Sequence, residues 1–311
     1  MTDRPHLDHI TVLLAEAIRY LNIKSGGSYI DCTLGGGGHA KAILENSTPD
    51  GRLLGFDADP VAIASTFGRL KEFGRRAVMV NENFCKLQKV AEEQSYCPAD
   101  GIVFDLGLST LQLDTPERGF SFQADAPLDM RFSPRQTLTA ADIVNAISEY
   151  ELADLIFRNG DEPSSRRIAR YIVQNRPLLT TFQLAAVVMR AVGGRRGKIH
   201  PATKTFQALR IAVNEEMDSL HSALAQSVQV LAPYGRLVVI SFHSLEDRIV
   251  KDFMRQEAKG CLCPPRLPQC VCGRQPTVRL ITRKVVTPSS AEVDRNPRSR
   301  SAKLRACEKL A

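Results

Sequence analysis

Short apolar runs alternate with helical patterns over the first third of the 311-residue chain. The runs predict buried strands at 28–33, 52–56, 77–80 and 101–104. Apolar residues spaced three or four apart predict helices at 11–21, near 39–44, from Pro60 onward and at 85–95. Thr11 is the expected cap of the first helix. This alternation predicts a parallel sheet that helices cover on both faces.

The alternation then stops for about a hundred residues. Residues 113–204 carry no convincing strand pattern, and helices are expected at 140–157, 165–173 and 181–192. The strand pattern returns at 236–241, after a long predicted helix near 206–231, and a late hairpin-like pair is expected at 278–283 and 285–287. We therefore predict an α/β domain formed by residues 1–112 and 205–311, interrupted by an all-helical insertion at 113–204.

Composition and charge narrow the class of protein. The hydrophobic content of 43% is ordinary for a globular chain, and no apolar stretch is long enough to cross a bilayer or to form a signal peptide. We expect a cytoplasmic protein with no membrane association. The net charge is +7, and the chain from Arg266 onward contains eleven Lys or Arg but only three acidic residues. Together with a second basic cluster at 195–204, this favours a nucleic-acid partner, although a solvated tail is the alternative.

A run of four glycines follows the first predicted strand, at Gly35–Gly38. Glycine at that edge of a sheet allows a cofactor to approach the backbone closely. Asp57 ends the second strand, where a carboxylate suits the two hydroxyls of a ribose, and Asp105 ends the fourth. Phe84 follows the third strand and is suited to lie against an adenine. The glycines alone also fit a dinucleotide site or a structural turn, but their combination with the acidic strand ends resembles the Rossmann-like methyltransferases.

Longer motifs carry a more specific resemblance. Eight stretches are similar to the bacterial 16S ribosomal RNA (cytosine-N4)-methyltransferase H (RsmH/MraW) family: 9–16, 31–39, 105–109, 118–122, 127–131, 200–203, 241–248 and 296–300. The resemblance covers nearly the whole chain. It implies a class I Rossmann-like fold with a helical insertion, S-adenosyl-L-methionine as cofactor, and methylation of a cytidine in the decoding region of 16S rRNA in the small ribosomal subunit.

The resemblance also implies which residues contact the cofactor: Gly37, Gly38, His39, Asp57, Phe84, Asp105 and Gln112. For His39 the alternative is a solvent-facing residue at the start of a helix, and for Gln112 an ordinary loop residue. The helical insertion and the basic tail are the segments that we expect to hold the RNA.

Two residues are candidates for the chemistry itself. Asp105, or a backbone carbonyl beside it, is expected to accept a hydrogen bond from the exocyclic amine of cytosine. The alternative is that Asp105 holds the amino-acid part of the cofactor. Many amino-methyltransferases carry an Asn/Asp/Ser-Pro-Pro-aromatic tetrapeptide there, whereas this chain has Asp105-Leu-Gly-Leu. His243 follows the fifth strand and is expected to contact the base or a phosphate, the alternative being a cap of the helix that begins near Leu245. The base must leave its stack to be reached.

Four of the eight cysteines are closely spaced: Cys261, Cys263, Cys270 and Cys272. Four thiolates bind zinc tetrahedrally, but C-x-C spacing is tighter than the usual C-x-x-C, so a reduced or redox-sensitive loop is the other interpretation. No catalytic metal is predicted.

Three other functions remain open at this point. A dehydrogenase would use the same glycine loop, but no Tyr/Lys or His pairing supports one. A non-enzymatic RNA-binding or assembly protein would leave Asp57 and Asp105 without a role. A methyltransferase with another acceptor, either a different base or a protein amine, is the nearest alternative. The oligomeric state stays open between a monomer and a homodimer.

Overall fold

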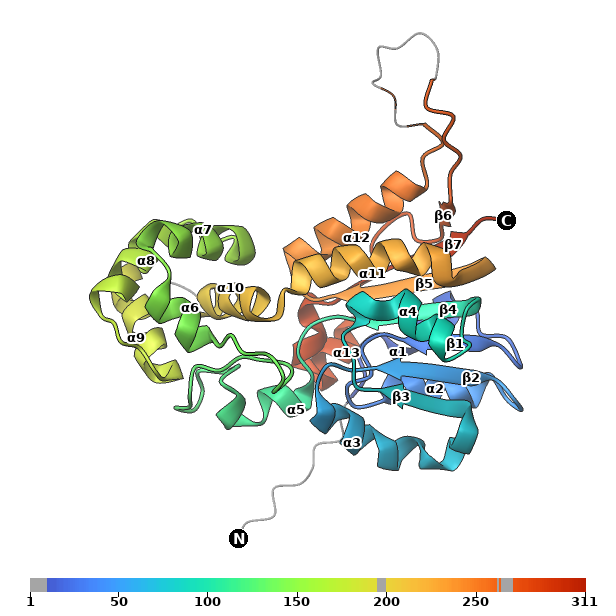
Figure 1. Ribbon diagram of the computed structural model, residues 1–311, viewed down its shortest axis with the longest axis horizontal. Coiled ribbons are helices and arrows are strands. Elements are labelled where there is room, and N and C mark those ends of the chain that lie inside the picture. Colours follow the sequence, from blue (N-terminus) through green and yellow to red (C-terminus); the bar gives the residue numbers. More distant parts are fainter. Residues whose placement is uncertain (1–9, 195–199, 262, 264–270) are drawn as a thin grey trace. The chain divides into compact units, whose positions relative to one another are not determined.

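The structure is a computed structural model that describes residues 10–194, 200–261, 263 and 271–311 (Figure 1). The chain forms two compact units. Unit 1 consists of the residues up to Gly107 together with Ser219–Ala311, and unit 2 consists of Leu108–Asp218. The boundaries predicted from the sequence are 112/113 and 204/205, so the observed unit 2 includes more residues at both ends.

Unit 1 contains a seven-stranded mixed sheet in the order β3-β2-β1-β4-β5-β7-β6. The strands are β1 Ser28–Asp31, β2 Arg52–Phe56, β3 Ala77–Val80, β4 Ala99–Asp105, β5 Leu231–Ser241, β6 Val278–Leu280 and β7 Lys303–Lys309. Strands β1 to β5 pair in parallel, and β7 runs antiparallel to both of its neighbours. The strand order reverses between β1 and β4, which is where open α/β sheets bind ligands. The predicted α/β class is confirmed.

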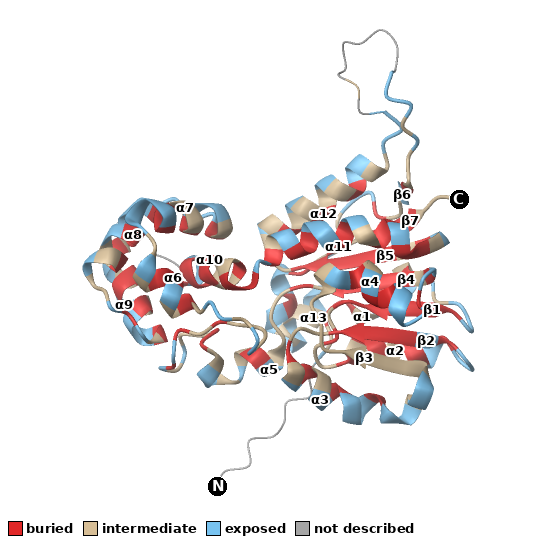
Figure 2. Cartoon of the chain, in the orientation of Figure 1, coloured by how far each residue is buried: buried red, intermediate tan, exposed pale blue. Residues whose placement is uncertain are grey.

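Helices cover both faces of this sheet because successive strand residues point to opposite sides. On one face, Tyr29 and Val103 pack in a core with helices α1 Leu14–Leu21, α2 Gly38–Asn46 and α3 Pro60–Leu70. On the other face, Ile30 and Phe104 pack with α4 Leu87–Glu93, α11 Glu216–Val230 and α12 Ser244–Glu257. Figure 2 shows the resulting continuous burial of the central strands. Pro60 opens α3 as predicted.

The carboxyl end of the chain departs from the prediction. We expected a basic tail after a late hairpin at 278–283 and 285–287. Instead, the partner of β6 is β7, and residue 286 makes only an isolated bridge to Leu304. Strand β7 enters the sheet because Leu304 and Ala306 are buried, while the charged Arg305 forms a bidentate pair with Asp247 at 2.7 and 3.2 Å. A short helix, α13 Ser290–Arg295, precedes it.

Unit 2 is helical. Its helices are α5 Thr110–Leu113, α6 Ala140–Ala146, α7 Glu149–Gly160, α8 Ser165–Gln174, α9 Thr181–Val192 and α10 Thr203–Asn214. The predicted helix at 140–157 is divided, since Ile147 is extended and Ser148 caps α7. The predicted long helix at 206–231 is also divided, at Glu215, which has a left-handed conformation (φ 49°). Helix α10 belongs to this unit because Phe206, Leu209 and Val213 lie in its core.

Two further observations complete the fold. The expected cap of α1 is wrong: the helix begins at Leu14 after a left-handed Leu13, and the hydroxyl of Thr11 is instead directed at Gly38. Within the described part of the chain, no helix combines the length and the apolar character that a bilayer crossing requires.

Candidate cofactor site

The glycine loop joins β1 to α2 and is fixed by the end of β2. The amide of Gly35 donates a hydrogen bond to Oδ2 of Asp57 (2.8 Å), and the amide of Asp59 donates to Oδ1 of Asp57 (2.9 Å). The side chain of Asn81 donates to the backbone carbonyl of Asp57 (2.9 Å), which ties the end of β2 to the residue after β3. The Asp57 carboxylate is therefore oriented toward the loop.

At two positions of the loop, neighbouring side chains approach the backbone so closely that only glycine fits. Gly37 has φ 74°, and a Cβ there would lie 2.5 Å from Cγ2 of Thr66. A Cβ on Gly38 would lie 1.8 Å from Oγ1 of Thr11. The hydroxyl of Thr66 also donates to the carbonyl of Gly35 (2.7 Å). The loop is thus held by side chains from α3 and from the segment before α1, and any side chain would displace them.

His39 and Asp105 meet at the other side of the loop. His39 lies in the first turn of α2 and is 4% exposed, so the alternative of a solvent-facing residue is wrong. Its Nδ1 lies 3.6 Å from Oδ2 of Asp105. The amide of Asp105 donates to the hydroxyl of Thr33 (2.5 Å), which sets the position of the carboxyl group at the end of β4. Asp57 and Asp105 therefore flank the same glycine loop.

The carboxyl groups at this edge are electrostatically coupled. Burial raises the pKa of Asp31 to about 7, and the charge of Asp57 contributes in the same direction. Burial also raises the pKa of Asp105 well above its usual range, and the charges of Asp31 and Glu246 raise it further. Neither pKa is affected by a lysine or arginine in the part of the chain that the structure describes. A cationic ligand would favour the ionised form of these carboxyl groups, because its charge compensates for the water that burial removes.

The remaining predicted residues have different surroundings. Phe84 begins a 3₁₀ turn after β3, and its ring packs edge-on against Phe104 with centroids 5.6 Å apart. Gln112 lies in α5 of unit 2, where it is buried and forms a capping box with Ser109 at 3.1 and 3.2 Å. The alternative of an ordinary loop residue is thus wrong for Gln112, but the structure gives its position only within unit 2.

His243 is the N-cap of α12. Its Nδ1 accepts from the amide of Glu246 (3.4 Å), and the Glu246 carboxylate accepts from the amide of His243 (3.3 Å). Nε2 of His243 lies 3.1 Å from Oε1 of the same carboxylate. The capping interpretation is confirmed, and a role toward substrate stays a prediction.

Three residues near the loop were not among the predicted site residues: Thr33, Asp31 and Glu246. Of these, only Asp31 was part of the methyltransferase-like pattern, as the acidic residue four positions before the first glycine. Thr33 positions Asp105, and the other two raise the pKa of Asp105. Only their positions in the sequence could have indicated these residues. Thr33 and Asp31 lie at the end of β1, beside the glycines. Glu246 lies three residues after His243, where the acidic partner of a capping box is found.

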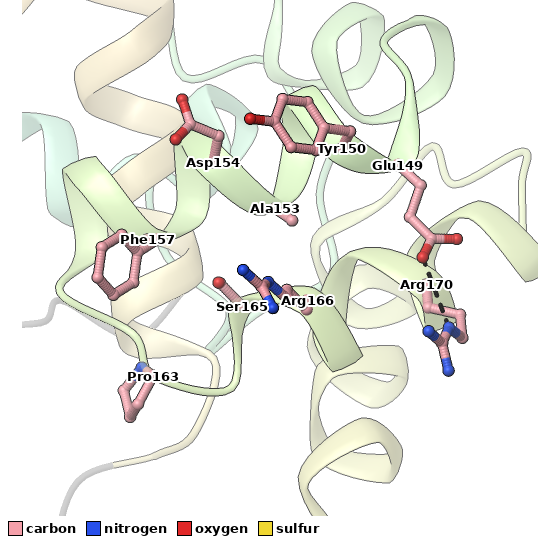
Figure 3. Close-up of a pocket in the computed structure, with 9 residues that line it drawn as sticks. All are labelled: Glu149, Tyr150, Ala153, Asp154, Phe157, Pro163, Ser165, Arg166 and Arg170. Atoms are coloured by element: carbon pink, nitrogen blue, oxygen red, sulfur yellow. Dashed lines mark hydrogen bonds and ion pairs between the residues drawn. The ribbon is translucent and has the colours of Figure 1, made fainter.

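Two further features involve residues outside the glycine loop. A pocket of about 560 Å³ in unit 2 is bordered by α7 and α8 (Figure 3). In unit 1, Cys261, Cys263 and Cys272 lie close together after α12. The fourth cysteine of the predicted group, Cys270, lies outside the described residues.

Comparison with known proteins gives the family. The model of the MraW methylase family matches residues 6–310. A protein of Dehalococcoides mccartyi named ribosomal RNA small subunit methyltransferase H is 60% identical over 97% of this chain and 86% of its own length. A protein of the same name from Thermomicrobium roseum is 53% identical over 97% of this chain and 94% of its own. The chain belongs to the MraW methylase family.

Proposed function

We propose that this protein transfers a methyl group from S-adenosyl-L-methionine to the exocyclic N4 of a cytidine in the decoding region of 16S rRNA. The observation that carries the proposal is the glycine loop flanked by Asp57 and Asp105, with buried carboxyl groups that favour a cationic ligand. The sulfonium of the methyl donor is such a cation. The family relatives named for small-subunit ribosomal RNA give the substrate class. A cytoplasmic location follows from that substrate.

We assign the cofactor to Gly37, Gly38, His39, Asp57, Phe84, Asp105 and Gln112, as the resemblance implies. Asp57 would bind the ribose hydroxyls, because its carboxylate is already oriented by the amides of Gly35 and Asp59. Gly37 and Gly38 would allow the donor to lie against the backbone. Bound there, the cofactor supplies an electrophilic methyl group. Stabilisation by S-adenosylhomocysteine but not by NAD in a thermal shift assay separates this proposal from a dehydrogenase.

Asp105 is proposed to accept the hydrogen bond of the cytosine amine. The nitrogen lone pair is conjugated into the ring, so an acceptor on the amine protons makes the nitrogen a better nucleophile. Within the described chain, Oδ1 of Asp105 is buried and has no hydrogen-bond partner. Burial raises the pKa of Asp105, so its carboxylate, once ionised, is a stronger base toward that proton than an exposed one.

The test of this role is Asp105→Asn. The amide keeps the shape of the side chain but lacks its charge, so turnover is expected to fall by about 100-fold or more while the affinity for S-adenosylhomocysteine is retained. Asp100→Asn is the matched control, since Asp100 lies on the same strand and accepts a hydrogen bond from the amide of Ser28 (2.9 Å). Unchanged turnover in Asp105→Asn would eliminate the role. Loss of cofactor affinity with turnover preserved at saturation would assign Asp105 to the cofactor instead.

Unit 2 is proposed to hold part of the RNA at the pocket between α7 and α8. Tyr150 and Phe157 are 82% and 57% exposed and stand seven residues apart, so they share one face of α7. Arg166 of α8 borders the same pocket, and Figure 3 shows its guanidinium among the lining residues. Exposed aromatic rings beside a guanidinium are suited to stack unpaired bases and to contact a phosphate.

The RNA role of this pocket is tested with Tyr150→Ala/Phe157→Ala. Loss of one stacked base costs about 1–3 kcal/mol, so the affinity for small-subunit RNA is expected to fall roughly tenfold or more. Binding of S-adenosylhomocysteine should not change. Phe67→Ala is the control, because Phe67 is similarly exposed (60%) but lies on α3 of unit 1. Equal RNA affinities for the double variant and the control would reject this surface.

The experiment that tests the function as a whole is mass-spectrometric mapping of small-subunit RNA from cells with and without the gene. One N4-methylcytidine mark in the decoding region should disappear and return on complementation with the wild-type chain. A mark that persists without the protein, or a lost mark on another base or on a protein amine, would refute the assigned acceptor.

A further inference from the structure

Three cysteines outside the cofactor site lie together in the segment between α12 and β6. The reactive sulfur atoms of Cys261, Cys263 and Cys272 all lie within 4.8 Å of one another. Nothing in the methyl-transfer chemistry uses them. We propose that these three thiolates bind a structural zinc ion, with one further ligand completing a tetrahedral site.

The distances between the sulfur atoms fit a metal rather than a disulfide. Zinc–sulfur bonds are about 2.3 Å long, so two thiolates at neighbouring corners of a tetrahedron are about 3.8 Å apart. Sγ of Cys272 lies 3.8 Å from Sγ of Cys261, close to that value. The sulfur atoms of a disulfide would be about 2.05 Å apart.

The backbone around Cys261 supports the thiolate form. The amide of Cys263 donates a hydrogen bond to Sγ of Cys261 (3.4 Å). The C-x-C spacing thus places the backbone N–H group of Cys263 next to the sulfur atom of Cys261. Hydrogen bonds to a charged ligand favour its ionised form, and the ligands of zinc must be deprotonated.

Among the residues of this segment that the structure describes, none forms a hydrophobic core that could gather the three side chains. Of the described residues from 259 to 274, all are exposed or half-buried, and Val271 is 78% exposed. The base of the segment is closed separately, by Arg274 paired with Glu257 (2.7 Å) and by the amide of Thr277 bonded to the carbonyl of Glu257 (2.9 Å). A metal bound by both Cys261 and Cys272 would cross-link the chain beyond that closure, as metals do in small zinc-bound modules.

The choice of zinc follows from the donor set. Soft thiolates in tetrahedral geometry select zinc or an iron–sulfur centre, and they disfavour the hard cations Mg²⁺ and Ca²⁺. A zinc–thiolate site is colourless, whereas an iron–sulfur centre is coloured and must be assembled as a cluster. Absorption and elemental analysis therefore distinguish the two metals.

The test is metal analysis of the full-length protein, purified under reducing conditions without a polyhistidine tag. About one zinc per chain is expected. In Cys261→Ser/Cys272→Ser the zinc content should fall about tenfold or more, because two of the ligands are lost. Cys97→Ser is the control, since Cys97 is also exposed but lies after α4, and it should keep the metal.

A second measurement is independent of how the protein was produced. After removal of zinc, Co²⁺ should give the thiolate charge-transfer absorption of a tetrahedral site in the wild type and in Cys97→Ser, and not in the double variant. Retained binding of S-adenosylhomocysteine by the double variant shows that unit 1 is folded. Zinc-free wild-type protein that also fails to bind Co²⁺, iron in place of zinc, equal zinc in the double variant, or a disulfide at these cysteines would each overturn the proposal.

Discussion

The buried Asp31 makes a prediction about stability that can be worked out from its surroundings. Asp31 ends β1, is 1% exposed and accepts a hydrogen bond from the amide of Thr33 (3.0 Å). Burial raises its pKa from 3.8 to about 7. Between these pH values the folded chain keeps a proton that the unfolded chain has released. Asp31 therefore lowers the free energy of unfolding by about 1.4 kcal/mol per pH unit across this window, about 4 kcal/mol in total by neutral pH.

Asp31→Asn removes the charge but keeps an oxygen that accepts from Thr33. Relative to the wild type, the variant should gain stability as the pH rises from about 4 to about 7, by up to about 4 kcal/mol, and the difference should level off above that window. The measurement is the free energy of unfolding by urea for both chains across this pH series. The value is an upper bound, because the neighbouring carboxyl groups respond to the lost charge.

Asp247→Asn provides a control of opposite sign. Burial alone would raise the pKa of Asp247, but its hydrogen bonds and charge interaction with Arg305, together with Lys303, hold that pKa below its usual range. The stability that Asp247 contributes is present at neutral pH and is lost as the pH falls through this lowered pKa. Asp247→Asn should therefore be destabilised at neutral pH and approach the wild type in acid. A difference for Asp31→Asn that stays constant from pH 4 to 8 would show that Asp31 is ionised in the folded chain at all these pH values, and the electrostatic description of the loop would be wrong.

Two further predictions concern the loop and the cap of α12. Gly38→Ala should lower the free energy of unfolding by about 1–3 kcal/mol because its Cβ would collide with Thr11, and Thr11→Gly in the same chain should restore part of it. Gly68→Ala, with open space around its Cβ, is the control, and equal unfolding midpoints for the two alanine variants would refute the close approach. His243→Ala should lose about 1 kcal/mol with the cap, whereas His243→Asn should keep it. We predict that His243 also contacts the substrate, so His243→Asn should lose turnover at unchanged stability. Full turnover in His243→Asn would show that His243 acts only as the cap of α12.

The parts of the fold that the sequence predicted are those in which local pattern and tertiary environment agree. Strands β2 and β3 and helix α9 have the predicted boundaries, because each is a clear apolar pattern closed by a turn or a cap. The division between α10 and α11 was missed because the left-handed residue there is Glu215 rather than glycine, so no local signal marks the break.

Strand β7 was missed for a different reason. Its sequence Lys-Leu-Arg-Ala-Cys-Glu-Lys has the alternation of a half-buried strand, but the number of charges suggested a tail. Those charges are matched by partners distant in the sequence: Glu308 pairs with Arg236 (3.0 Å) and with Arg279 (2.7 Å). Pairing between residues more than twenty positions apart cannot be read from a local window.

The candidate site shows the same division. The glycines, Asp57 and Asp105 could be selected from the sequence because parallel strands bring their carboxyl ends to one edge. The burial of His39, and the coupling of Asp105 to Asp31 and Glu246, depend on packing between β1, β4 and α12 that no single segment encodes.

The cost of the buried carboxyl groups to folding and their proposed role with the cofactor have one physical origin. Ionising Asp31 or Asp105 is unfavourable because burial removes water from a charge, and a cation in the same place compensates that loss. The methyl donor carries a sulfonium charge, whereas the thioether left after transfer is neutral at sulfur. If the sulfonium binds beside these carboxyl groups, as proposed, the donor should bind more tightly than its product, and increasingly so as the pH rises through the pKa of Asp31 at about 7. On this proposal, the destabilisation that Asp31 imposes at neutral pH and the preference for a charged donor have the same cause, and a donor-to-product affinity ratio that does not change between about pH 5 and 8 would contradict it.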